Sequence, residues 1–207
     1  KSLNSAKKRW PNALIVATGC YAERADKELN EMGSVDLVVK GSNKSDIVSS
    51  VVEYIGDYEY LDTENEGNFS GNLLGRTRAS IKIQEGCDQV CSYCIVPKVR
   101  GRERSVPLIK ILESIIKLSN VGVKEVILTG TQLGSYGFET TNMSLAKLIE
   151  AILIETNIQR LRVSSIQPQE LTDDLLNIWR TNNRLCKHFH LPLQSGSNEI
   201  LKNMRRR

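Results

Sequence analysis

Residues 81–107 read IKIQEGCDQVCSYCIVPKVRGRERSVP, and this stretch is the starting point for predicting the fold. A strand-like run leads directly into three cysteines within eight residues, and a block of arginines follows them. In β/α folds, the loops that follow the strands carry the chemistry. The stretch therefore predicts a functional loop at the carboxyl end of a strand that opens a β/α series.

The sequence around this loop alternates between strand and helix patterns. We predict strands at 78–86, 124–130, 160–166 and 188–194, and helices at 107–122, 144–156, 172–182 and 197–207. Serial β/α units form a parallel sheet with helices outside it. Four such units predict an incomplete (β/α) half-barrel over residues 77–207.

A smaller parallel-sheet domain is predicted over residues 1–60. Strand patterns at 12–20 and 35–41 alternate with helical patterns at 21–33 and 44–56, so the fold class is α/β throughout. Residues 57–75 lack periodicity and are rich in acidic residues, Gly, Asn and Ser, which places a domain boundary there and a linker at 61–76. We expect a chain truncated at both ends, because its first helix has no evident packing partner and its last helix has no cap.

Composition narrows the functional classes. A chain of 207 residues that is 40% hydrophobic can bury a core, and a net charge of +4 is too small to indicate nucleic-acid binding by itself. No leader sequence or long apolar run is present, so we expect a cytoplasmic protein without a membrane partner. Five cysteines, mostly clustered, favour metal binding over a disulfide framework.

Cys87, Cys91 and Cys94 have the spacing C-x-x-x-C-x-x-C, so three thiolates can reach one metal centre. Zinc needs four ligands, and the fourth would have to be Cys186, His188 or His190, far along the chain. An iron–sulfur cluster fits better, because three cysteines leave one iron free for an exogenous ligand. The alternative is a non-catalytic, zinc-stabilised RNA-binding module.

The spacing resembles the signature loop of the radical S-adenosylmethionine (SAM) enzymes. The strings EGCDQVCSYCIVPKVRGRERS (85–105) and HLPLQSGS (190–197) resemble the methylthiotransferases within that family, and the likeness covers essentially the whole chain. It implies that Cys87, Cys91 and Cys94 bind a four-iron, four-sulfur (4Fe-4S) cluster. The open iron of such a cluster holds SAM, which is cleaved to a 5′-deoxyadenosyl radical.

The resemblance also implies that side chains at the strand ends bind SAM. Tyr93 matches the position near the adenine, and the other matching positions are Gly130, Thr131 and Gln132 for the methionine end, Gln194 and Ser195 for the ribose, and Ser165 for the same cavity. Structural alternatives are a rim aromatic for Tyr93, an ordinary glycine turn at 130–132, and a helix cap provided by Ser197.

Cys20 follows the run LIVATG (14–19) at the end of a predicted strand. A lone cysteine in this position is usually a buried structural residue. The resemblance implies instead that Cys20 is one of three ligands of an auxiliary 4Fe-4S cluster, whose other two cysteines are not among these 207 residues. We therefore expect two clusters in the full-length parent and incomplete activity for this chain alone.

Lys98, Arg100, Arg102 and Arg104 follow the cysteines and suit an RNA backbone, although a salt-bridged or solvated loop is the alternative. The strings LTGTQLGSYG (128–137) and SSIQPQELTDDLL (164–176) look most like the branch that acts on N6-threonylcarbamoyladenosine. The resemblance thus implies methylthiolation of tRNA at C2 of that nucleoside, next to the anticodon. N6-isopentenyladenosine or a ribosomal protein are the alternative substrates, and a flavodoxin or ferredoxin system is the expected electron donor.

Overall fold

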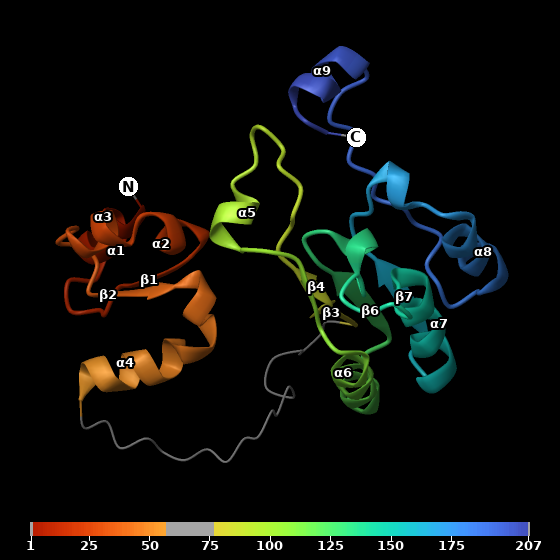
Figure 1. Ribbon diagram of the computed structural model, residues 1–207. Helices are drawn as coiled ribbons and strands as arrows, with labels where there is room; N and C mark the ends of the chain where they lie inside the picture. Colours follow the sequence, from red (N-terminus) through yellow and green to blue (C-terminus); the bar gives the residue numbers. More distant parts are fainter. Residues whose placement is uncertain (1, 57–76, 207) are drawn as a thin grey trace. The chain divides into compact units, whose positions relative to one another are not determined.

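The computed structural model describes residues 2–56 and 77–206 (Figure 1). They form two compact units: the first contains residues 2–56 together with 98–100, and the second contains the other residues after the gap. The predicted boundary at 57–75 and linker at 61–76 lie outside the described residues, and the domain limits stay predictions. Within the described ranges, no helix has the length and apolar character needed to cross a membrane.

The first unit is built on a two-stranded parallel sheet, as predicted. Strands β1 (Val16–Gly19) and β2 (Leu37–Lys40) pair in parallel. The accompanying helices are α1 (Ser2–Arg9), α2 (Cys20–Arg24), α3 (Asp26–Asn30), the 3-10 helix η1 (Gly41–Asp46) and α4 (Ile47–Ile55). The single helix predicted at 21–33 is wrong in detail, because Ala25 leaves helical geometry (φ −130°, ψ 40°) and separates α2 from α3.

Helix α1 does have packing partners, contrary to the prediction. Leu3 packs against the small core formed by Ala17, Ala22 and Leu29. Lys7 Nζ forms an ion pair with Asp36 Oδ2 at 2.8 Å. This ion pair lowers the pKa of Asp36, as does the backbone N–H of Ile15.

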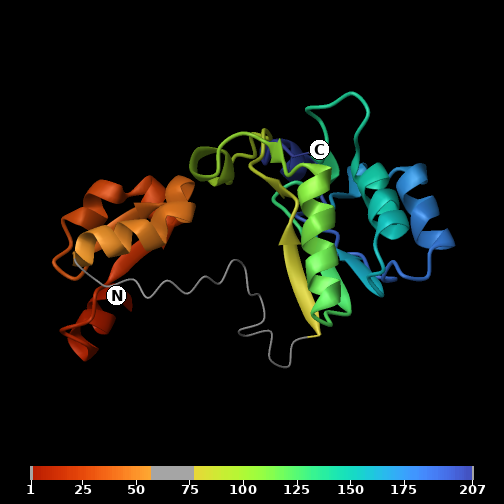
Figure 2. The same cartoon turned by 90° about the horizontal axis from the view of Figure 1, so that it is seen from below.

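The second unit contains a three-stranded parallel sheet in the order β3 (Arg78–Lys82), β6 (Glu125–Thr129), β7 (Arg160–Val163). Helices α6 (Leu108–Asn120), α7 (Leu145–Glu155) and α8 (Asp173–Thr181) accompany these strands, and Figure 2 shows α6 running alongside β3. The apolar residues of α6 recur at helical spacing and are buried together with strand residues such as Val126 and Leu161. The sheet is open over the described residues, which agrees with the predicted incomplete barrel.

The fourth strand, predicted at 188–194, is wrong as a regular strand. Within it, one isolated parallel bridge forms, Ser165 to His190, and a second bridge, Leu161 to Leu185, lies just before the predicted segment. Pro192 has no amide hydrogen to donate to a ladder, and Leu193 is 83% exposed. The last helix, α9 (Asn198–Asn203), is also shorter than the predicted 197–207.

Candidate radical cluster site

The three clustered cysteines lie on a closed loop beyond β3. Strand β4 (Gln84–Glu85) leaves the sheet and pairs antiparallel with β5 (Arg104–Ser105), so the two arms of the loop are joined at its base. The Cys87 N–H donates to Gly101 O at 3.2 Å. The short helix α5 (Val96–Val99) lies within the loop, which therefore begins and ends at fixed points.

Gly86 allows the two arms to approach closely. Its φ of +78° favours glycine, and an added Cβ would collide with the backbone carbonyl of Arg102. No other residue fits here without moving the opposite arm. The residue immediately before Cys87 thus sets the start of the loop.

Ion pairs within the loop involve two of the predicted RNA-binding residues. Arg102 Nη2 lies 3.0 Å from Asp88 Oδ2, and Arg104 Nη2 lies 2.9 Å from Glu85 Oε2. The pKa of Asp88 is lowered by the Glu103 backbone N–H and by Arg102. The side chains of Arg102 and Arg104 remain 89% and 58% exposed, so both still present charge to solvent.

Lys98 and Arg100 are exposed as well. All four predicted basic residues are therefore exposed, and they follow the cysteines in the sequence. Their contact with RNA stays a prediction, because two of them already pair with carboxylates of the loop itself.

A cavity of about 150 Å³ lies in front of the cysteines. Seven of the predicted site residues line it, namely Cys87, Cys91, Cys94, Tyr93, Thr131, Gln132 and Ser165. The structure thus brings together the cysteine loop, the turn after β6 and the end of β7.

Three other predicted residues lie outside the lining of this cavity. Gly130 packs against Gln84, and a Cβ there would lie 2.8 Å from Leu133 Cδ2. Gln194 Oε1 accepts a hydrogen bond from the Tyr93 hydroxyl at 3.1 Å. Ser195 Oγ accepts from the Ser197 N–H at 3.1 Å.

Ser197 caps α9, as the structural alternative predicted. Its Oγ accepts from the Ile200 N–H at 3.5 Å, which satisfies one free amide at the start of the helix. Ser165, by contrast, points its Oγ at His190 Nδ1, 2.7 Å away.

A buried glutamine that the sequence analysis missed links the cysteine loop to the second strand. Gln84 is fully buried, and its Oε1 accepts from the backbone N–H groups of Thr131 and Gln132 at 2.9 and 2.7 Å. Its Nε2 donates to Gly86 O at 3.0 Å. The available signal was a glutamine near the end of the predicted strand 78–86, three residues before the first cysteine.

Gln132 extends this network to the third strand. Its Oε1 lies 3.9 Å from Cys87 Sγ and also accepts from Gln167 Nε2, while its own Nε2 donates to Glu170. Glu170 ends the 3-10 helix η4 (Pro168–Glu170) and also accepts from the Gln167 N–H at 2.9 Å. Sequence analysis missed Gln167 and Glu170, although the string QPQE (167–170) places them directly after a strand.

Burial raises the pKa values of two residues that line the cavity. It raises the pKa of the Cys87 thiol, and it also raises the pKa of Glu170 against the opposing effect of hydrogen bonds from Gln167, Gly134 and Gln132. A buried thiol stays protonated unless a cation or a metal stabilises the thiolate. The cysteine site therefore favours a thiolate when a metal centre binds.

The cysteines suit a cluster better than a single metal ion. In an iron–sulfur cluster each thiolate binds a different iron, so three cysteines on one loop suffice and one iron stays open. Cys186, His188 and His190, the candidate fourth zinc ligands, do not line the cavity.

Cys186 has the packing role that was predicted for it. It is 7% exposed, and its carbonyl accepts from Trp179 Nε1–H at 3.0 Å. Cys20, in contrast, is exposed at the start of α2, directly after the carboxyl end of β1. The auxiliary cluster at Cys20 stays a prediction.

Residues 81–207 match the family profile described as the Radical SAM superfamily. The chain belongs to the radical SAM superfamily. Membership implies a 4Fe-4S cluster and SAM, and the three-cysteine loop with its cavity fits that pair of cofactors. The matched segment of this radical SAM chain contains the whole loop and every strand of its three-stranded sheet except the first residues of β3.

Curated relatives match the radical SAM chain along its length. The threonylcarbamoyladenosine tRNA methylthiotransferase MtaB of Aquifex aeolicus is 39% identical, over 100% of this chain and 52% of the relative. The tRNA-2-methylthio-N(6)-dimethylallyladenosine synthase of Fusobacterium nucleatum is 36% identical, over 97% of this chain and 48% of the relative. The chain thus spans about half the length of the curated relatives it matches.

A solved structure shares the fold of the radical SAM chain. The cobalamin-dependent S-adenosylmethionine radical enzyme OxsB has a TM-score of 0.59 and 14% identity, over 98% of this chain and 34% of that one. At this identity the likeness concerns the fold alone.

Proposed function

We propose that the chain forms part of a tRNA methylthiotransferase that acts at C2 of N6-threonylcarbamoyladenosine, next to the anticodon. The observation that carries this proposal is the cysteine loop and its cavity in a chain that resembles the Aquifex aeolicus enzyme along its whole length. The name of that relative supplies the substrate class, and the radical SAM loop supplies the type of chemistry.

In this proposal the residues of the chain bind, orient and shield the cofactors. Cys87, Cys91 and Cys94 hold the cluster, and Gln132 holds the cavity wall against Cys87. Bound there, a 4Fe-4S cluster with SAM supplies the one-electron chemistry that generates a 5′-deoxyadenosyl radical. Buried Leu133 lines the cavity, and its apolar side chain keeps water from the reacting centre.

Contacts to SAM are proposed for the remaining residues of the predicted set. Tyr93, Thr131, Gln132 and Ser165 lie in the cavity lining. Gln194 lies one hydrogen bond behind Tyr93. Gly130 and Ser195 belong to the turns that present these side chains, and we propose that they contribute backbone groups.

The complete reaction needs parts beyond the radical cluster. We propose that Cys20 is one ligand of an auxiliary cluster that holds the inserted sulfur, and that its other cysteines are not among these 207 residues. We further propose a flavodoxin or ferredoxin system as electron donor. Lys98, Arg100, Arg102 and Arg104 would then contact the RNA backbone through their exposed charges.

The experiment combines radical formation with product analysis. The anaerobically reconstituted chain is incubated with SAM, a reductant and tRNA that carries N6-threonylcarbamoyladenosine. We expect the chain to form 5′-deoxyadenosine. We expect the mass gain of a methylthio group, measured by mass spectrometry of the nucleosides, only from a longer parent protein that supplies the remaining auxiliary-cluster cysteines. Cys91→Ala is the matched control and should form no 5′-deoxyadenosine. Failure of the unaltered chain to cleave SAM would contradict the proposal.

A second candidate substrate is N6-isopentenyladenosine, the dimethylallyl nucleoside. The Fusobacterium nucleatum relative, at 36% identity, carries that nucleoside in its name. The same assay with tRNA bearing this nucleoside separates the two substrates. Stimulation by this tRNA alone would replace the first candidate with the second.

A further inference from the structure

We propose that Arg206 is a positioning residue of the radical cluster. In this role it fixes Tyr93 on the cysteine loop and provides the positive charge that balances the cysteine thiolates, which raises the reduction potential of the bound cluster. The inference rests on the cluster assigned under the proposed function.

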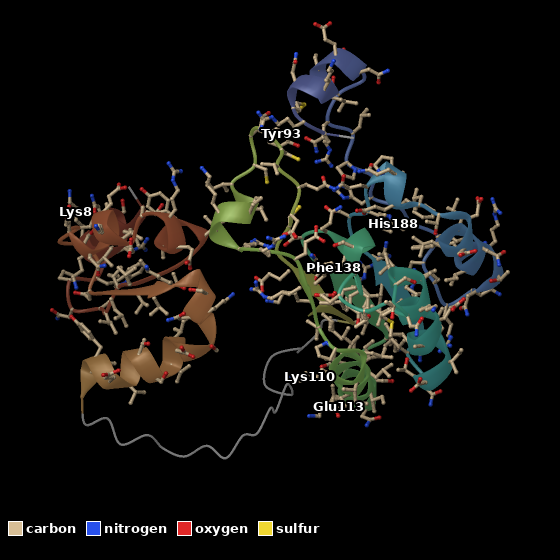
Figure 3. The ribbon with its side chains drawn as sticks, in the orientation of Figure 1. Lys8, Tyr93, Lys110, Glu113, Phe138 and His188 are labelled. Atoms are coloured by element: carbon tan, nitrogen blue, oxygen red, sulfur yellow. The ribbon has the colours of Figure 1, made fainter. Side chains whose placement is uncertain are left out.

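Three hydrogen bonds tie the cysteine loop to the segments around α9. The Ser92 N–H donates to Met204 O at 3.0 Å, and Arg206 Nη1 donates to the Tyr93 hydroxyl at 3.3 Å. The Tyr93 hydroxyl in turn donates to Gln194 Oε1 at 3.1 Å. Figure 3 shows Tyr93 at the end of the loop that faces this segment.

Tyr93 depends on these bonds for its orientation. The residue is 51% exposed, so packing alone holds its ring weakly. Its hydroxyl receives one hydrogen bond from Arg206 and gives one to Gln194, which uses both its acceptor and its donor capacity. Arg206 therefore fixes the aromatic side chain of Tyr93, which lies between Cys91 and Cys94 in the sequence and lines the same cavity.

The charges around the cavity point to an electrostatic role for Arg206. Apart from the cysteines, the charged residues in its lining are Glu170 and Arg206. The Glu170 carboxylate is engaged by Gln132 and by the Gln167 N–H, whereas Arg206 makes no ion pair with any residue in the described ranges. Its charge is thus available to the three thiolates.

A positive charge near a cluster favours the reduced form. Each reduction adds an electron, so a neighbouring cation stabilises the product more than the reactant. At the effective dielectric of protein sites, one nearby unit charge shifts such an equilibrium by roughly tenfold. The cluster must be reduced before it can deliver an electron to SAM. The charge of Arg206 therefore makes this first reduction easier.

The preceding residue provides a matched control. Arg205 has the same charge but lines a different cavity, whose lining also includes Asp88, Glu103 and Glu170. Arg205 has a φ of +52°, so the backbone turns sharply there and the side chains of Arg205 and Arg206 line different cavities. An effect of Arg206 that depends on position must be absent when Arg205 is changed.

The test is an anaerobic redox titration of the reconstituted chain, followed by electron paramagnetic resonance, first without SAM and then with it. We expect Arg206→Gln to take up iron normally and to have a lower midpoint potential. At the midpoint potential of the unaltered chain, the ratio of reduced to oxidised cluster in this variant should be roughly tenfold lower. Arg206→Lys should stay close to the unaltered chain. Arg205→Gln should show no comparable shift.

Several outcomes would overturn the proposal. One is a midpoint potential of Arg206→Gln that equals that of Arg205→Gln. Another is a shift of the midpoint potential that appears only when SAM is present, because Arg206 would then act by binding SAM. If Arg206→Gln loses iron, retention in Arg206→Lys supports the role of the charge, and loss in both variants contradicts it. An unaltered chain without iron would instead contradict the proposed function.

Discussion

At the scale of the residue, Gly86 decides whether the cysteine loop can close. Its positive φ and its approach to the Arg102 carbonyl leave no space for a Cβ. We expect Gly86→Ala to lower the free energy of unfolding by more than about 2 kcal/mol, because backbone strain and overlap add together. Iron uptake should fall as well.

Gly122→Ala is the matched control for this change. Gly122 also has a positive φ, +89°, but an added Cβ would meet nothing within 4 Å. We expect a loss of about 1 kcal/mol from backbone strain alone. Thermal unfolding of both variants checks the difference, and equal losses would contradict the proposed contact between the loop arms.

Gln84 is the residue that joins the cysteine loop to the turn after β6. Gln84→Leu should lower the free energy of unfolding by about 3 kcal/mol, because it leaves the N–H groups of Thr131 and Gln132 without their acceptor. Gln159→Leu, at an exposed position outside this network, should change stability by less than about 0.5 kcal/mol. Urea unfolding of both variants measures the effect, and a loss no larger than that of the control would refute it.

The cysteines were predictable from the sequence because their spacing is local. Cys87, Cys91 and Cys94 stand close together in the chain, and their residue type restricts the chemistry. Gln132 was found only through the family resemblance, and Glu170 was not found. Gln132 and Glu170 lie in turns that follow different strands and contact each other only in the folded chain. Such a contact between distant segments cannot be predicted from local sequence patterns.

At the scale of the element, one buried carboxylate joins the three strands of the second sheet. Glu125 on β6 pairs with Arg78 on β3 and with Arg160 and Arg162 on β7. Burial acts to raise the pKa of Glu125, but the hydrogen bond from Arg162 and the charges of the three arginines outweigh it and lower the pKa overall. The carboxylate therefore stabilises the sheet only while it is ionised.

We expect Glu125→Gln to lower the free energy of unfolding by about 2 kcal/mol at neutral pH. Because the folded pKa lies below the unfolded value of about 4.3, the contribution is complete above that value. It is lost as pH falls through the folded pKa. The free energies of unfolding of the unaltered chain and of Glu125→Gln should therefore differ at about pH 7 and become similar at about pH 3. Chemical unfolding at both pH values measures this difference. Glu113→Gln, on the exposed face of α6, should show no such trend.

The helices were predicted better than the strands at the sheet edge. Periodic apolar residues at 107–122 and 144–156 predicted α6 and α7, because burial against a sheet requires that spacing. The segment 188–194 alternates apolar and polar residues but forms only one isolated bridge. Strand formation depends on a neighbouring strand and on available amides, so the local pattern alone was insufficient.

At the scale of the whole molecule, we propose that the chain supplies one set of three cluster ligands. Cys87, Cys91 and Cys94 line one cavity, whereas Cys20 is exposed and Cys186 is buried in packing. The central claim is that the three loop cysteines bind a 4Fe-4S cluster. This claim predicts how much iron each chain binds and which single cysteine substitutions abolish iron binding.

The most direct test is the iron, sulfide and zinc content per chain after anaerobic reconstitution, together with the absorbance spectrum. We predict about four irons per chain, complete loss in Cys91→Ala, and retention in Cys186→Ala. About one zinc per chain without iron uptake, or equal loss of iron in both variants, would contradict the account.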